Sequence, residues 1–277
     1  MLHWIRSGLP GPTVCFSFGV HGDERAPIDA GYALAASLSA DALSAGSLLL
    51  LLGNPEAVAA GRRYLEVDLN RCFTAAVLGR SPRSREEQRA QALAAALREV
   101  EILLDFHCTV EPGERFVMHH PDDARHRQIS TLLDASVVLS DPGLCFGGCS
   151  LDELLSTSGR VGICYETGWI GDPANTPERI VVQMRNVLRG LGMLPGTAHR
   201  LDQRRLVLTQ TLRCPSGGFA WAAGVGHNLQ SLPAGTLLGE GGDGALHLQA
   251  PATLIFPKKR PHVLQPGQPL VYLAAGA

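Results

Sequence analysis

The 277-residue sequence lacks any C-x-x-C pair, and its cysteines number seven, which is an odd count. A disulfide framework or a cysteine zinc site would need paired or closely spaced cysteines, so neither is predicted. Cys15, Cys108 and Cys164 lie in apolar runs, where a reduced cysteine behaves as a small core residue. We therefore expect a reducing, cytoplasmic environment.

Long runs of charge of one sign are also absent, and the formal net charge is only -2. A protein that binds nucleic acid or a membrane surface needs a basic face, so neither partner is expected. The first residues lack the charged-then-apolar layout of a signal peptide. The apolar run at 47–53 is far too short to cross a bilayer. These absences leave a small molecule as the expected partner, and an acidic one would be bound by a few local arginines.

Short apolar runs alternate with longer amphipathic runs through the first two-thirds of the chain. Strands are predicted at 13–19, 47–53, 101–106, 114–120, 135–141 and 161–166, and helices at 26–38, 85–100 and 177–191. This alternation predicts an α/β fold with a mainly parallel or mixed central sheet and helices on both of its faces.

The pattern of apolar runs and turn residues changes after about Leu194. From His199 onward, short β-like runs are separated by turns rich in glycine and proline, and no helical pattern of useful length remains. We predict a catalytic domain at 1–198 and a small all-β domain at 199–277.

The segment GVHGDERAP follows a predicted buried strand and leads into a predicted helix. It carries His21 and Glu24, and its glycines permit a tight backbone that would let the two side chains converge. His107 follows the strand 101–106 and emerges at the same carboxyl edge of the sheet, where α/β proteins bind ligands. His-Glu-His is a known ligand set of catalytic zinc, with the fourth position left for water. His21, Glu24 and His107 are therefore predicted to hold a metal ion.

Two further carboxylates belong to this edge. Glu166 ends the strand 161–166, where it would act as a general base near the metal without binding it. Asp105 shares a strand face with His107 and is suited to orient its imidazole. The alternatives are an ordinary polar histidine at a strand end and a surface glutamate at the start of a loop, and the sequence alone leaves both open.

The segment GNPEAVAAGRRYLEVDLNRCF, at 53–73, follows another predicted strand and carries Arg63, Asn70 and Arg71. Arginines beside a zinc site stabilise a developing oxyanion and bind a carboxylate in bidentate fashion. The alternative is a solvated basic loop in which Asp68 pairs with these arginines.

Together these segments resemble the succinylglutamate desuccinylase/aspartoacylase family, relatives of the zinc carboxypeptidases. GVHGDERAP matches the family's G-x-H-G-(N/D)-E signature, and GNPEAVAAGRRYLEVDLNRCF matches its N-P...R-Y...D-x-N-R-x-F segment. LLDFHCT and CYETG match its D-x-H and E-x-G elements, in the family's order. The resemblance implies a carboxypeptidase-like α/β domain followed by a small β domain, with one Zn2+ per chain held by the three ligands named above.

Carried over residue by residue, the resemblance makes Glu166 the base that activates water at the metal. Arg63 matches the arginine that polarises the oxyanion, and Asn70 and Arg71 match the grip on the α-carboxylate of the amino-acid product. Family members that act on acylated acidic amino acids often carry a further arginine about ten residues before the base. Ser156 occupies that position here, so the acyl-group preference stays open.

The predicted activity is zinc-dependent hydrolysis of the amide bond of an N-acyl amino acid, which releases a carboxylic acid and an amino acid. One alternative is a metallocarboxypeptidase that acts on short peptides. Another is a zinc-bearing binding protein without turnover, although such a protein would not need a base such as Glu166. The sequence leaves open the acyl group, the amino acid, the choice among borderline divalent ions, and whether a homo-oligomer forms.

Overall fold

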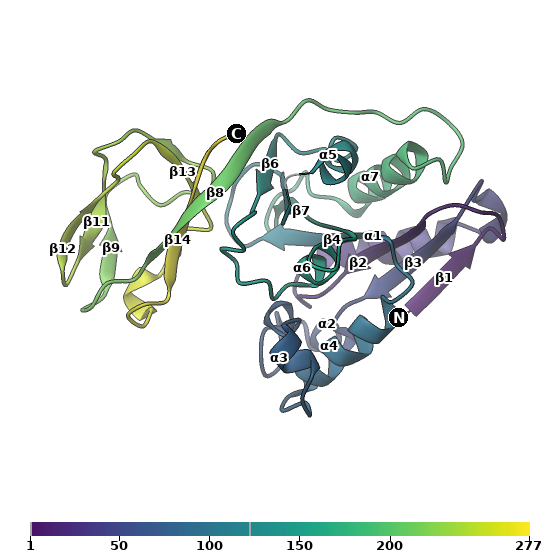
Figure 1. Cartoon of the computed structure of the whole chain (residues 1–277), viewed down its shortest axis with the longest axis horizontal. Helices are drawn as coiled ribbons and strands as arrows, with labels where there is room; N and C mark the ends of the chain where they lie inside the picture. Colours follow the sequence, from purple (N-terminus) through teal and green to yellow (C-terminus); the bar gives the residue numbers. More distant parts are fainter. Residues whose placement is uncertain (1, 122) are drawn as a thin grey trace.

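The apolar runs of the first two-thirds of the chain form neighbouring strands of one large sheet in the computed structural model, which describes residues 2–121 and 123–277 (Figure 1). In spatial order the strands are β1 (Leu2–Arg6), β3 (Ser47–Leu52), β2 (Thr13–Phe18), β4 (Ile102–Thr109), β7 (Val161–Trp169), β5 (Phe116–His119), β6 (Val137–Ser140), β8 (Arg204–Arg213), β14 (Pro269–Gly276), β13 (Ala252–Ile255) and β10 (Ser231–Leu232). Strands β3, β2, β4 and β7 run parallel, whereas β1 is antiparallel to β3 and β5 is antiparallel to β7. The predicted mixed central sheet is confirmed.

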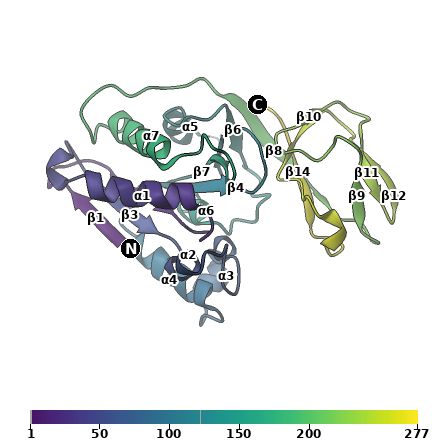
Figure 2. The ribbon, with the colours of Figure 1, turned by 180° about the vertical axis from the view of Figure 1, so that it is seen from behind.

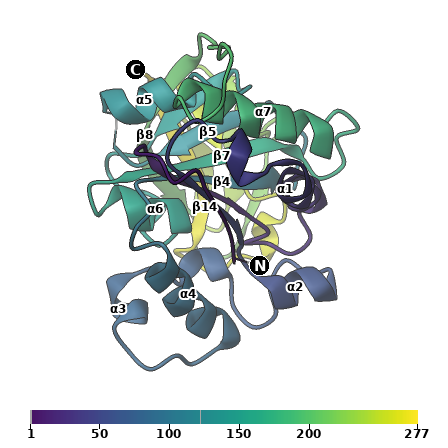
Figure 3. The same ribbon diagram turned by 90° about the vertical axis from the view of Figure 1, so that its right-hand side faces the viewer.

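Helices cover both faces of this sheet. They are α1 (Arg25–Ser37), α2 (Pro55–Ala60), α3 (Ala75–Leu78), α4 (Arg85–Ala96), α5 (Ala124–Ser130), α6 (Leu151–Ser156) and α7 (Pro177–Gly190). Helices α1 and α7 pack side by side on one face, together with α5 (Figures 2 and 3). Helices α4 and α6 lie on the opposite face (Figure 3). No helix in the described ranges is long and apolar enough to cross a membrane.

The side chains of the central strands alternate between two hydrophobic cores. In β4, Leu104 and Phe106 join the core beneath α1 and α7, whereas Leu103 joins the core beneath α4 and α6. Successive side chains of a strand point to opposite faces, so Asp105 and His107 lie on the α4/α6 side with Leu103. Every residue of β4 is buried, which explains why its sequence reads as a nearly continuous apolar run.

The C-terminal part continues the large sheet and adds a small one. Strand β8 pairs in parallel with β6 and antiparallel with β14, so the large sheet runs without a break past residue 198. A separate antiparallel sheet consists of β12 (Gly244–His247), β11 (Leu237–Gly241) and β9 (Phe219–Trp221), far from β1 (Figure 1). The predicted small all-β region is confirmed, while the domain division at 198/199 stays a prediction.

Two strands extend beyond their predicted ends. β4 continues to Thr109 and β7 continues to Trp169, because their backbones remain paired past the expected loop starts. His107 lies opposite Glu166 in this pairing. The two side chains are therefore held by regular sheet structure, not by loops.

Candidate metal centre and active site

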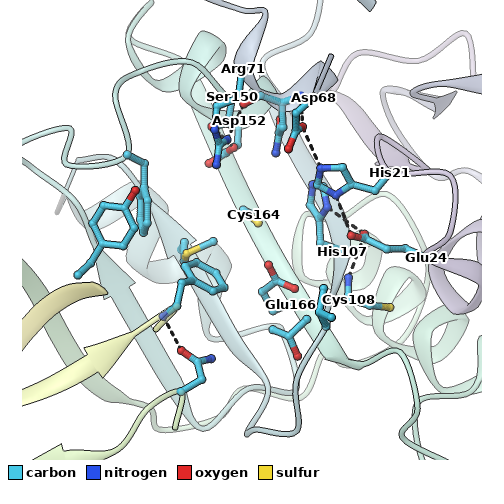
Figure 4. A pocket seen from close by; sticks show the side chains of 18 of the residues that line it. His21, Glu24, Asp68, Arg71, His107, Cys108, Ser150, Asp152, Cys164 and Glu166 are labelled. Atoms are coloured by element: carbon cyan, nitrogen blue, oxygen red, sulfur yellow. Dashed lines mark hydrogen bonds and ion pairs between the residues drawn. The ribbon is translucent and has the colours of Figure 1, made fainter. Parts of the chain in front are cut away.

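His21, Glu24 and His107 converge on one point although two separate segments of the chain supply them (Figure 4). The turn between β2 and α1 carries the first two, and β4 carries the third. Nδ1 of His21 lies 2.7 Å from Oε1 of Glu24, and Nδ1 of His107 lies 3.0 Å from Oε2 of the same carboxylate. All three residues are buried, and their candidate ligand atoms all lie within 4.8 Å of one another.

A second carboxylate faces the far side of each imidazole. Nε2 of His107 lies 2.8 Å from Oδ2 of Asp105, which is the contact expected from their shared strand face. Nε2 of His21 lies 3.1 Å from Oδ1 of Asp68, a contact that the sequence did not predict. Both imidazoles thus present Nδ1 to the cluster. Carboxylates placed in this way fix the orientation of metal-binding histidines and raise their basicity.

The charges around the cluster favour the binding of positive charge, either as protons or as a cation. Burial alone would lower the pKa of His107, but Asp105 and Glu24 raise it well above its usual value. Burial would raise the pKa of Glu24, yet His21 and His107 hold it well below its usual range. A buried carboxylate between two imidazoles therefore needs protons or a cation, and a divalent ion can replace the protons.

The geometry fits zinc. Two donor atoms that are each about 2.1 Å from a tetrahedral ion lie about 3.4 Å apart. The separations of 2.7 and 3.0 Å in the cluster differ from this by a small relaxation. Two imidazoles and one carboxylate are also a donor set that zinc favours, with one position left for water.

Two glycines shape the turn that carries His21 and Glu24. Gly19 has a φ of 65°, a left-handed conformation that other residues rarely adopt. Gly22 is needed for space, because a Cβ there would lie 2.2 Å from the carbonyl carbon of Ala57 in α2. The Gly22 N–H also donates to the carbonyl of Arg63, at 3.1 Å. The turn that carries His21 and Glu24 is thus joined directly to the segment that carries Arg63.

Arg63 lies beside the cluster. Its guanidinium is 3.5 Å from Oε1 of Glu24 and 3.6 Å from Oδ2 of Asp68, so the expected pairing of Asp68 with an arginine is present. Its side chain remains 38% exposed and lines a cavity next to the cluster. The guanidinium is therefore held in place and still accessible to a ligand.

Glu86 fixes the segment that follows Arg63, a role that the sequence did not reveal. This buried glutamate of α4 accepts hydrogen bonds from the backbone N–H groups of Leu65, Glu66 and Val67, the shortest at 2.7 Å. These bonds hold the pKa of Glu86 below its usual value against the effect of its burial. A single charged side chain thus sets the path of the loop between two candidate site residues.

Asn70 and Arg71 follow in a short 3-10 turn, Leu69–Arg71, and both line the cavity. Oδ1 of Asn70 accepts from the backbone N–H of Leu151 at 3.0 Å, which ties the turn to the start of α6. Arg71 donates to the carbonyl of Asn70 and lies beside the thiol of Cys149. No carboxylate of residues 2–121 and 123–277 forms an ion pair with Arg71, so its charge is available to an anionic ligand.

Glu166 reaches the cavity from β7, next to His107 but outside the three-residue cluster (Figure 4). It is buried, and its Oε2 has no hydrogen-bond partner within the described part of the chain. Burial, together with the charge of Glu24, raises the pKa of Glu166 to about 7. A carboxyl group with an open oxygen and a pKa near neutrality is suited to exchange a proton with water or a ligand.

The cavity has a volume of about 520 Å³, which suits a small molecule. The C-terminal part supplies one wall of it, with Phe256 and Tyr272. Ser156 does not line it. The Ser156 hydroxyl donates instead to the carbonyls of Asp152 and Gly162, between α6 and β7.

Comparisons with known proteins agree with this structure. The family model of the succinylglutamate desuccinylase/aspartoacylase catalytic domain matches residues 10–141. The succinylglutamate desuccinylase of Pseudomonas aeruginosa is 28% identical over 235 residues, which cover 74% of this chain and 68% of that protein. That of Burkholderia orbicola is 51% identical over 108 residues, covering 34% of this chain and 30% of the relative. The crystal structure of the Chromobacterium violaceum enzyme superimposes with a TM-score of 0.79 at 21% identity, covering 100% of this chain and 88% of that one, which is a likeness of fold.

A large mixed sheet flanked by helices, with a buried His-Glu-His cluster opening into a cavity, defines an α/β protein with a candidate metal-dependent active site. His21, Glu24 and His107 lie within the region matched by the family model, whereas Glu166 lies beyond its end at residue 141. Nearly half of the chain thus matches the catalytic-domain model of the succinylglutamate desuccinylase/aspartoacylase family, and its curated relatives carry the name of a hydrolase that removes a succinyl group.

Proposed function

We propose that this chain is a zinc-dependent hydrolase that cleaves the amide bond of an N-acyl amino acid into a carboxylic acid and a free amino acid. The observation that carries the proposal is the convergence of His21, Glu24 and His107 on one point, with a second carboxylate behind each imidazole. Zinc bound by such a set lowers the pKa of a water molecule and polarises a carbonyl group, which is the chemistry that amide hydrolysis requires.

Glu166 would move the proton in this reaction. Its unpartnered Oε2 takes the proton released when water adds to the amide carbon, and the same carboxyl group returns it to the leaving nitrogen. The strand pairing with His107 keeps Glu166 beside the cluster throughout. The amide is thereby hydrolysed to a carboxylic acid and an amine. Glu166 ends the reaction in the protonation state in which it started.

Two arginines would stabilise the negative charges of the reaction, namely the developing oxyanion and the α-carboxylate of the amino acid. Arg63 is held by Glu24 and Asp68, so its guanidinium is oriented before negative charge develops on the carbonyl oxygen. Arg71 has no carboxylate partner within the described residues, and a planar guanidinium binds a carboxylate with two parallel hydrogen bonds. Asn70 and Arg71 are therefore assigned to the α-carboxylate of the amino acid.

The test combines metal analysis with a hydrolysis panel. We expect one zinc ion per chain, and hydrolysis of N-succinyl or N-acetyl amino acids that is lost on chelation and restored by zinc. Faster cleavage of short peptides than of any N-acyl amino acid would favour a metallocarboxypeptidase. Full zinc occupancy with no hydrolysis of either class would favour a zinc-bearing binding protein.

We also propose that the enzyme works in the cytoplasm. All seven cysteines are free thiols in the structure, and six of them are buried, as expected of a protein kept reduced. Measuring the distribution of a tagged chain between cell fractions would check this assignment.

A further inference from the structure

The wall of the cavity opposite the metal cluster contains a charge that the proposed reaction does not yet use. Of the 24 lysines and arginines in the chain only two are lysines, and they are the neighbours Lys258 and Lys259. Lys258 follows β13 and lines the same cavity as Arg63 and Arg71. A cation from the C-terminal part thus faces two cations from the α/β part.

The backbone around Lys258 is fixed on every side. Its N–H donates to the carbonyl of Leu270 at 3.0 Å, and its own carbonyl accepts from Nε1 of Trp221 at 2.7 Å. Phe256, two residues earlier, has a φ of 50°, which is rare for a residue other than glycine, and its N–H donates to Oδ1 of Asn228. The chain is bent sharply here and held bent, which directs the following residues to the cavity wall.

Both lysines line the cavity, but they have different surroundings. Lys259 lies 3.7 Å from a carboxylate oxygen of Glu111. Lys258 forms no ion pair with any carboxylate in the described ranges, and burial together with the charges of Arg71 and Arg63 lowers its pKa. Asp68, whose negative charge acts in the opposite direction on the pKa of Lys258, is already engaged by His21 and Arg63. Lys258, Arg63 and Arg71 therefore form a local group of three positive charges on the cavity lining, and an anionic ligand bound there would relieve their mutual repulsion.

A second substrate carboxylate would supply that anion. The position at which relatives often carry an additional arginine is Ser156, and this residue packs between α6 and β7, outside the cavity. An arginine that binds a second carboxylate is therefore missing from that wall. Lys258 offers a positive charge from a different part of the chain.

We propose that Lys258 is a substrate-binding residue that contacts a carboxylate of the N-acyl amino acid other than the one assigned to Asn70 and Arg71. This inference rests on the proposed function. The second carboxylate has two sources, a dicarboxylic acyl group or an acidic amino-acid side chain, and both offer Lys258 the same chemistry.

The first experiment compares Lys258→Met with the wild-type enzyme on N-acetylalanine, N-succinylalanine and N-acetylglutamate. The first substrate has one carboxylate, and the other two place a second carboxylate on the acyl group or on the amino acid. Loss of one charge-assisted contact is expected to raise KM by about tenfold for one dicarboxylic substrate, with kcat retained. KM for N-acetylalanine should change by less than about twofold, and the affected substrate identifies which carboxylate Lys258 contacts.

Lys259→Met is the matched control, since it removes the same charge one residue away and leaves all three KM values within about twofold. Equal effects of Lys258→Met on all three substrates, or no effect on any, would overturn the proposal. Equal effects of Lys258→Met and Lys259→Met on KM would also overturn the proposal. They would indicate that the substrate responds to the total positive charge near the cavity and not to a direct contact with Lys258.

A second readout does not depend on turnover. Reductive 13C-methylation keeps the lysine charge and gives NMR signals from only two lysine side chains, which Lys259→Met assigns. Titration of the zinc-loaded protein with succinate, glutamate and alanine should shift the Lys258 signal with one dicarboxylate and leave it unchanged with alanine. If no N-acyl amino acid is hydrolysed but this shift occurs, the proposed reaction fails and the carboxylate site stands. If hydrolysis occurs and no dicarboxylate shifts the signal, only the role of Lys258 fails.

Discussion

The two ends of the cavity are formed by different parts of the large sheet (Figure 4). At one end, β4 and β7 are buried along almost their whole length, and they hold His107 and Glu166 in regular pairing. At the other end, β8 has exposed residues along half its length, and the loop after β13 brings Phe256 and Lys258 to the opposite wall. The buried strands position the groups to which we assign the bond-making and bond-breaking steps, whereas the partly exposed end supplies a wall that can vary without disturbing them. Substitutions at the first end should therefore change kcat, and those at the second should change KM.

The largest effect is expected from Glu166→Gln, which tests the buried end directly. The amide cannot take a proton from water, so kcat should fall by about 10²- to 10⁴-fold. Zinc content measured by elemental analysis should stay at the wild-type level, because Glu166 lies outside the three-residue cluster. Near-normal turnover would show that another group is the base.

Arg63→Met should have the next largest effect. Removing a preorganised donor for the developing oxyanion is expected to lower kcat by about 10²- to 10³-fold, with KM changing much less. Steady-state kinetics on an N-acyl amino acid would measure this fall in kcat. Arg63→Lys is the control, because it keeps the positive charge but loses the planar guanidinium with its paired N–H donors. A change confined to KM would place Arg63 among the substrate-holding groups instead.

Glu86→Ala tests whether the buried end depends on one structural carboxylate. The variant leaves three backbone N–H groups of the loop at 65–67 without their acceptor, so the free energy of unfolding should fall by about 2–4 kcal/mol. Denaturant unfolding at neutral pH would measure this loss.

The loss from Glu86→Ala should also depend on pH in a defined direction. The pKa of Glu86 is lowered in the folded state, so its contribution is complete above its unfolded pKa of about 4.3 and disappears as pH falls through the lower folded value. The difference in stability between wild type and Glu86→Ala should therefore shrink in acid. A difference that grows on acidification would contradict the assigned ionisation.

The smallest effect is expected at the contact between the two ends. Glu111→Gln removes the ion pair with Lys259, and both side chains are more than one-third exposed. Its effect on the free energy of unfolding should stay below about 1 kcal/mol, as measured by denaturant unfolding. A larger loss would mean that the Glu111–Lys259 ion pair holds the C-terminal wall firmly against the loop after β4. The C-terminal end of the cavity would then be less free to vary than we infer.

The central strands could be predicted because parallel strands covered on both faces leave long apolar runs in the sequence. β1 left no such run, since only Ile5 among its five residues is fully buried. Helices α2, α3, α5 and α6 were not predicted either, because elements of four to seven residues are too short to show a 3.6-residue period. The pairing of β8 with β6 depends on three-dimensional neighbours and has no local signal.

The same limit applies to the site. His21, Glu24 and His107 could be placed together because each follows or ends a predicted strand of one sheet. The contact of Asp68 with His21 and the bonds from Glu86 depend on the path of a loop, which no periodicity encodes. Lys258 comes from a part of the chain whose relation to the cavity is set by β8 and β14 crossing back to the sheet. Sequence reasoning thus found the groups that regular structure positions and missed those that loops position.

The close approach of Gly22 to Ala57 has a consequence for how such enzymes can diverge. No side chain fits at Gly22 between the turn that carries His21 and Glu24 and helix α2, and the backbone N–H of Gly22 donates to the carbonyl of Arg63. An insertion or deletion between 55 and 63 would therefore displace both partners at once. In chimeras made between relatives, the two segments should be exchanged only as a pair, while the loop bearing Lys258 can be exchanged alone.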